Sequence, residues 1–236
     1  TLQALAAEGA DSFYRGPIAR RFAAGCREVG TLVTAEDLAD YTPEEQMPIE
    51  TTYRGYTVRE APPNSMGWVL LEELNIVEQF DLAAMGALTA ETVHVLVEAK
   101  KLAFADRERY ASDPRVFAAP LDALLSKAHA AALAARIDPT RAAPPPQAAA
   151  SPGGDTTFFC VVDGDGNAVS AIQSINKPFG SGITAGETGI LLNNRMSPWH
   201  LEPDHPNRLQ PGKRVRHTMN PPMVFKDGEL WGVFGT

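Results

Sequence analysis

The sequence lacks several features that would each have pointed to a particular class of protein. It has only 2 cysteines, Cys26 and Cys160, which lie far apart and without metal-ligand spacing, so a zinc site or a disulfide scaffold is not expected. No apolar run approaches the roughly 20 residues of a membrane helix. Basic residues are outnumbered, with 21 Lys and Arg against 29 Asp and Glu, which argues against a nucleic-acid partner. We therefore expect no metal, no cofactor, no nucleic acid and no membrane segment, and we expect both cysteines to be buried apolar residues.

What is present is enough apolar material for one sizeable core, because 44% of the 236 residues are hydrophobic. The chain starts at Thr1 without Met and without a secretory signal, and it ends at Thr236 within a strand-like run. These two features indicate a segment of a longer protein. The compartment stays open between the cytoplasm and the periplasm or the exterior.

The first part of the chain carries mainly helical patterns. Apolar residues recur at helical spacing up to about residue 24, and Thr34 opens a capping box with Asp37. An alternating run rich in Thr, Tyr and Val predicts one strand over residues 49–60, broken by Pro62 and Pro63. Helical periodicity then predicts three helices, at residues 67–80, 91–110 and 122–137.

The pattern changes after a low-complexity linker at residues 142–155, which is rich in Pro, Ala and Gly. Strands are predicted at residues 156–163 and 168–175, joined by a Gly-Asp-Gly-Asn turn. Further strands are predicted at residues 189–192, 223–226 and 230–234. Helices before the linker and strands after it indicate an α+β fold whose two halves share one core.

The junction at Thr156 has a possible chemical purpose. A hydroxyl acts as a nucleophile only if a base takes its proton, and an N-terminal threonine can use its own α-amino group, with a pKa near 8. That amine becomes free only when the peptide bond after Asp155 is cut. The local sequence alone favours a simpler interpretation, in which Thr156 and Thr157 are ordinary residues that open a strand.

Motifs spread along the chain favour the chemical interpretation. They are Tyr14-Arg15-Gly16, Tyr53-Arg54-Gly55-Tyr56-Thr57-Val58, Pro62-Pro63, Leu74-Asn75-Ile76, Ala105-Asp106-Arg107, Asp113-Pro114, Asp155-Thr156-Thr157, Val161-Val162-Asp163, Gly166-Asn167-Ala168-Val169-Ser170, Phe179-Gly180, Gly189-Ile190-Leu191-Leu192-Asn193-Asn194 and Pro211-Gly212-Lys213-Arg214. In this order they resemble the γ-glutamyltranspeptidase (γ-glutamyltransferase) family of N-terminal nucleophile hydrolases over essentially the whole length.

The resemblance implies an αββα sandwich made as a precursor that cuts itself between Asp155 and Thr156. Residues 1–155 would be the C-terminal part of the large subunit, and residues 156–236 the N-terminal part of the small subunit. Thr156 would then take an acyl group, such as γ-glutamyl from glutathione, and pass it to water or an amine. Ser174 falls where the family has a hydroxyl that hydrogen-bonds the nucleophile, and Asn176 where it has a substrate-binding asparagine. Both types are also common at strand ends and turns.

Other positions depart from the family. Arg195 and Pro198 stand where the ammonium of a γ-glutamyl donor is held, and a guanidinium repels an ammonium. Arg195 would suit a donor that has a carboxylate and no ammonium; otherwise it is a surface charge. His217 and Thr218 replace two serines that contact the donor carboxylate, and His217 either binds an anion or packs.

This combination resembles the branch that includes oxamate amidohydrolase, and more distantly the cephalosporin (glutaryl) acylases. By the resemblance, the oxyanion hole lies past Thr236 and a donor-binding arginine lies before Thr1, so the chain alone is expected to lack full activity. An unprocessed fragment without catalysis is the alternative from another class.

Overall fold

The computed structural model describes residues 1–144 and 156–235, which form two compact units. Unit 1 contains residues 1–45 and 174–195. Unit 2 contains residues 46–144, 156–173 and 196–235. Among the described residues, no helix is both long and apolar enough to cross a membrane.

Unit 1 is a small helical unit. It contains α1 (Leu2–Glu8), α2 (Asp11–Tyr14), α3 (Pro17–Glu28), α4 (Ala35–Ala39) and the 3-10 helix η1 (Gly186–Thr188). The Thr34 capping box of α4 is confirmed, with both reciprocal bonds formed to Asp37. Gly25 on α3 lies so close to η1 that a Cβ there would sit 2.3 Å from the Gly186 nitrogen. Only glycine at this position permits the contact.

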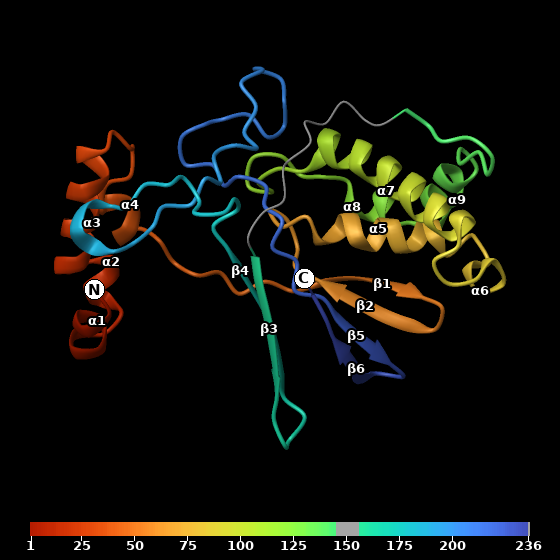
Figure 1. The fold of residues 1–236 in the computed structure, drawn as a ribbon, viewed down its shortest axis with the longest axis horizontal. Coiled ribbons are helices and arrows are strands. Elements are labelled where there is room, and N and C mark those ends of the chain that lie inside the picture. Colours follow the sequence, from red (N-terminus) through yellow and green to blue (C-terminus); the bar gives the residue numbers. More distant parts are fainter. Residues whose placement is uncertain (145–155, 236) are drawn as a thin grey trace. The chain divides into compact units, whose positions relative to one another are not determined.

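Unit 2 contains an antiparallel sheet of four strands in the order β1 (Ile49–Tyr53), β2 (Tyr56–Glu60), β5 (Met223–Lys226) and β6 (Glu229–Val233) (Figure 1). The prediction of one strand over residues 49–60 was wrong, because β1 and β2 form a hairpin. The turn between them places Arg54 at φ 49° and Gly55 at φ 84°. Two positive φ angles in a row are typical of the tight turn that joins antiparallel strands.

Unit 2 also contains five helices, which together with the four-stranded sheet form a helix-and-sheet layer. They are α5 (Gly67–Val77), α6 (Leu82–Met85), α7 (Ala90–Tyr110), α8 (Leu121–Leu124) and α9 (Lys127–Ala134). Helix α5 contacts the sheet and also α7 and α9 (Figure 1). Its side chains Trp68, Leu71 and Ile76 are fully buried, as the helical periodicity of this segment predicts. The predicted helix over residues 122–137 is divided into α8 and α9, because the Ser126 side chain caps the start of α9.

The strands after the linker include a separate pair, β3 (Thr156–Val162) and β4 (Ala168–Ser174), which confirms the predicted hairpin. Cys26 is buried as expected, but Cys160 on β3 is exposed, so its predicted burial was wrong. The predicted strand at residues 189–192 is also absent from the described chain, where only an isolated bridge joins Thr184 and Leu191. Gly189 adopts φ 73°, which interrupts an extended strand. Most of the predicted linker, at residues 145–155, lies outside the described residues.

Candidate functional site

Thr156, the predicted nucleophile, is the exposed first residue of β3, and Asp155 lies outside the described residues. The turn at the far end of the strand is built by one side chain. Asp163 Oδ1 accepts hydrogen bonds from the N–H groups of Asp165 (3.0 Å) and Asn167 (2.9 Å), and Oδ2 accepts one from Asn167 Nδ2 (2.8 Å). This local turn sets the pairing of β3 with β4.

Ser174 and Asn176 lie together in unit 1. Ser174 Oγ accepts a hydrogen bond from the Asn176 N–H at 2.9 Å. Asn176 adopts φ 80°, and its Nδ2 donates to Asn194 Oδ1 at 3.0 Å. The Lys177 N–H donates to the same oxygen at 3.0 Å. Asn194 therefore orients the predicted substrate-binding asparagine, a contact that sequence reasoning missed although it quoted the Asn193-Asn194 pair as a motif.

Arg195 follows directly in the same unit. Its backbone N–H donates to Asn193 Oδ1 at 2.8 Å. The residue is half-buried, its Nε and Nη2 atoms are buried, and this burial lowers the pKa of the guanidinium. The Arg195 guanidinium is therefore only partly exposed to water, and its role in donor binding stays a prediction.

His217 and Thr218 lie in unit 2 on a segment held by the loop after the double proline. Asn64 Nδ2 donates to the Val215 carbonyl at 2.6 Å, and Ser65 Oγ donates to Asn220 Oδ1 at 2.7 Å. Backbone bonds of 3.1 Å join the Met66 N–H to the His217 carbonyl and the His217 N–H to the Asn64 carbonyl. The sequence does not predict these hydrogen bonds of Asn64 and Ser65, because their partners lie about 150 residues away along the chain.

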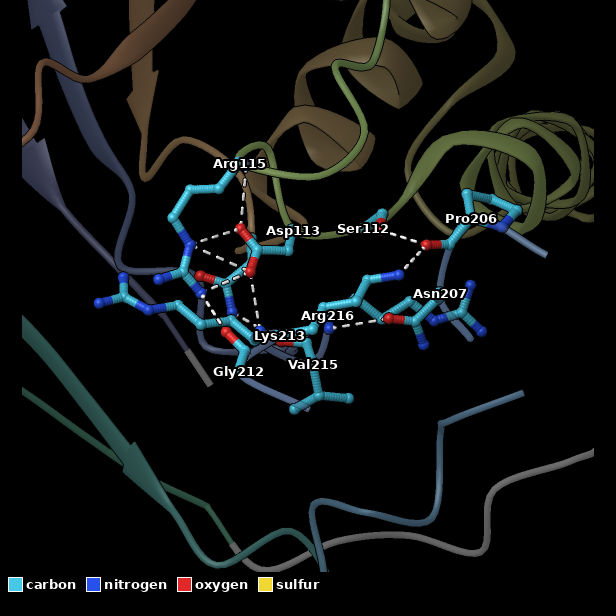
Figure 2. A network of polar contacts seen from close by, with 11 residues as sticks. Ser112, Asp113, Arg115, Pro206, Asn207, Gly212, Lys213, Val215 and Arg216 are labelled. Atoms are coloured by element: carbon cyan, nitrogen blue, oxygen red, sulfur yellow. Dashed lines mark hydrogen bonds and ion pairs between the residues drawn. The ribbon is translucent and has the colours of Figure 1, made fainter. Parts of the chain in front are cut away.

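The chain that leads to His217 is anchored by a second polar network (Figure 2). Asp113, which is fully buried, accepts hydrogen bonds from the Arg115 side chain (2.6 Å) and from the Arg214 N–H (2.8 Å). Burial alone would raise the pKa of Asp113, but these bonds outweigh it and lower the pKa to about 2. Ser112 and Lys213 both donate to the Pro206 carbonyl.

The predicted site residues are divided between the units. Thr156, His217 and Thr218 belong to unit 2, and Ser174, Asn176 and Arg195 belong to unit 1. Their roles in catalysis and binding stay predictions. Two groups of carboxylate and imidazole side chains among the described residues could hold a metal ion, and neither includes a predicted site residue.

Comparison with known proteins identifies the family. The family model described as gamma-glutamyltranspeptidase matches residues 1–236. The chain is 40% identical over 252 residues to the glutathione hydrolase proenzyme of Escherichia coli, covering 100% of this chain and 43% of that protein. It is 39% identical to the oxamate amidohydrolase proenzyme of Klebsiella pneumoniae, with 100% of this chain and 44% of that protein covered.

A solved structure agrees with these matches. The crystal structure of cephalosporin acylase from Bacillus halodurans aligns with a TM-score of 0.88 and 40% identity, covering 98% of this chain and 42% of that one. The chain thus has a mixed α+β fold and spans less than half the length of these relatives. It belongs to the gamma-glutamyltranspeptidase family.

Proposed function

We propose that the protein is an N-terminal threonine amidohydrolase of this family, and that the chain contributes part of an αββα sandwich. The observation that carries the proposal is the position of Thr156, which follows Gly-Gly-Asp and opens strand β3 within a family match that covers residues 1–236. The curated relatives named above are proenzymes, which supports a chain that is activated by cleavage.

The cleavage step uses only groups of the chain and one water molecule. Thr156 Oγ attacks the carbonyl carbon of Asp155, and the C–N bond to Thr156 breaks as an ester forms. Water then hydrolyses the ester, which leaves a carboxylate on Asp155 and a free α-amino group on Thr156. Residues 1–155 and 156–236 become parts of two subunits that stay in one fold.

The free amine then serves as the base for catalysis. It takes the proton of Thr156 Oγ, and the oxygen attacks the carbonyl carbon of the donor amide. The amine of the donor leaves with that proton, and the acyl group stays on Thr156 as an ester. Water, or an acceptor amine, removes the acyl group. Ser174 hydrogen-bonds the nucleophile and Asn176, oriented by Asn194, binds the substrate.

Two donor classes are supported by different observations. Identity to the Escherichia coli glutathione hydrolase proenzyme favours a γ-glutamyl donor such as glutathione. The half-buried Arg195 favours a donor with a carboxylate and no ammonium, in keeping with the oxamate amidohydrolase and cephalosporin acylase relatives. By the family resemblance, His217 and Thr218 would contact the donor carboxylate.

The first test is intact mass spectrometry of freshly purified protein beside two variants. Wild type is expected as two fragments that meet at Asp155 and Thr156, and Thr156→Ala as one uncut chain. Thr157→Ala is the matched control, since it removes the neighbouring hydroxyl and is expected to be cut like wild type. An uncut wild type would instead favour a fragment without catalysis.

The donor class is tested by comparing kcat/KM for glutathione with that for glutaryl and oxamate amides. If Arg195 binds a donor carboxylate, Arg195→Gln raises KM for the glutaryl and oxamate amides while self-cleavage stays intact. Glutathione cleaved far better than these amides by the wild-type protein would contradict the carboxylate-donor assignment and leave the γ-glutamyl assignment standing.

A further inference from the structure

A cluster of metal-ligating side chains lies between three helices of unit 2, and none of its members is a predicted acyl-transfer residue. Glu72 is on α5, Asp106 on α7 and His129 on α9, and their ligand atoms lie within 4.8 Å of one another. His129 Nε2 is 2.9 Å from Asp106 Oδ2 and 3.3 Å from Glu72 Oε1. Ligands projected inward from facing helices are a common way to build a metal site in a helical bundle.

Glu72 is buried beside a second carboxyl group and has few polar neighbours. Its side chain is 0% exposed, and among the described residues its polar neighbours are only the Asp106 carboxyl group and His129 Nε2, at 3.3 Å from Oε1. The Nε2 atom of His129 carries at most one hydrogen, and its hydrogen bond goes to Asp106. Two buried carboxyl groups side by side are costly when both are ionised, so either a retained proton or a cation must compensate them.

The spacing of the three ligand atoms suits a small tetrahedral cation. With metal–ligand bonds of about 2.0–2.1 Å, neighbouring ligands of a tetrahedral zinc ion lie roughly 3.3–3.4 Å apart. The distances of 2.9 and 3.3 Å from His129 Nε2 require only small adjustments to reach that value. The His129 side chain is 31% exposed, so solvent reaches this side of the cluster.

The charges around the cluster also favour a cation. The carboxyl groups of Glu72 and Asp106 converge on one place together with His129 Nε2, and two adjacent carboxylates attract a cation. Lys100 and Arg107 act on the neighbouring Glu73.

A second cluster of similar composition provides a contrast. Glu108, His200 and His205 also bring ligand atoms within 4.8 Å of one another. The Glu108 carboxylate, however, already accepts hydrogen bonds from Arg107 at 2.6 Å and from Arg216 at 2.7 Å. Two guanidinium groups occupy its oxygens and repel a cation, so this cluster is a poor metal site.

We propose that Glu72, Asp106 and His129 form a binding site for a divalent transition-metal ion, with zinc as the fitting candidate. The ion would join α5, α7 and α9 and stabilise the helical layer of unit 2. The proposal does not depend on the chemistry at Thr156.

The test uses chelator-treated purified protein, with Zn²⁺ as the probe in calorimetry and Co²⁺ as a spectroscopic probe in absorption. Wild type is expected to bind one equivalent of Zn²⁺, to gain thermal stability from it, and to give the visible bands of tetrahedral Co²⁺. Glu72→Gln and His129→Ala are each expected to weaken binding by more than about tenfold. His200→Ala removes an imidazole from the second cluster and is expected to bind like wild type.

Several outcomes would overturn the proposal: no Zn²⁺ binding by wild type, undiminished binding by Glu72→Gln, or equal loss in His200→Ala. Glu72→Gln remains informative even if His129→Ala fails to fold. Its amide is neutral and has the same shape as a protonated carboxyl group, so this variant is expected to fold. If wild type binds no zinc and the Glu72→Gln variant is as stable as wild type, these two results together would show that Glu72 holds a proton instead.

Discussion

The helix-and-sheet layer of unit 2 and the β3–β4 hairpin are stabilised in opposite ways. In the layer, Trp68 and Leu71 of α5 are 0% exposed and pack among residues from distant parts of the sequence. In the hairpin, Val161 and Val162 of β3 are each 57% exposed, and the turn is closed by Asp163 through residues two to four positions away. The layer depends on long-range packing, whereas the described contacts of the hairpin turn are local.

This difference separates the predicted functional residues. Thr156 lies at the start of the hairpin whose turn is closed by local hydrogen bonds. His217 and Thr218 lie on a segment that is anchored through Asn64, Ser65 and the Asp113 network. We therefore expect core substitutions to unfold the layer, and turn substitutions to disturb the strand that carries Thr156 while leaving the layer intact.

The largest effect is expected from Trp68→Ala, which removes a fully buried side chain from α5. Loss of its contacts and the remaining cavity should lower the free energy of unfolding by about 3–5 kcal/mol in urea denaturation. Val161→Ala is the matched variant in the hairpin, and its effect should stay within about 0.5 kcal/mol because the side chain is already exposed. Equal losses in the two variants would contradict the comparison.

A smaller effect is expected from Asp113→Asn, which tests the long-range polar network. The pKa of Asp113 is lowered to about 2 in the folded protein from an ordinary value of 3.8. The stabilisation is therefore complete above about pH 4 and is lost as the pH falls through 2. Since Arg115 is half exposed, we expect a loss of on the order of 1–2 kcal/mol at pH 7.

The pH profile distinguishes this ion pair from general damage. Wild type and Asp113→Asn should converge in stability as the pH approaches 2, when the carboxyl group of the wild type is protonated. Asp122→Asn, an exposed substitution on α8, is the control and should match wild type throughout. A constant difference between wild type and Asp113→Asn down to pH 2 would argue against the ionic contribution.

The same contrast explains which parts of the fold could be predicted from the sequence. The helix α7 and the strands β3, β4, β5 and β6 were predicted because each has its own periodicity and a turn or cap nearby. The hairpin at Arg54 was missed, since arginine seldom adopts positive φ and its turn signal is weak. The exposure of Cys160 was mispredicted because the burial of a strand residue depends on what packs against it, which local sequence does not specify.

The residues of the candidate site show the same difference between what local sequence predicts and what long-range contacts determine. Family motifs predicted Thr156, Ser174 and Asn176, and these remain predictions about function. The contacts that hold such residues were not predicted: Asn194 to Asn176 spans 18 positions, and Asn64 to Val215 spans 151. Contacts of this kind join segments that only the folded chain brings together, so no pattern within either segment reveals them.

The smallest and most local effect is expected from Asp163→Ala, which removes the acceptor of three hydrogen bonds in the β3–β4 turn. Amide hydrogens of β3 and β4 should exchange faster, while those of α5 and α7 stay protected, because the side-chain hydrogen bonds that Asp163 makes in the described chain stay within the turn. Asp165→Ala is the control, since Asp165 supplies its backbone N–H to the turn and keeps it after substitution. If Thr156 needs a firmly paired strand for cleavage, the Asp163→Ala precursor should also be cut more slowly than the control. Faster exchange throughout the helices would mean that the hairpin and the layer unfold as one cooperative unit.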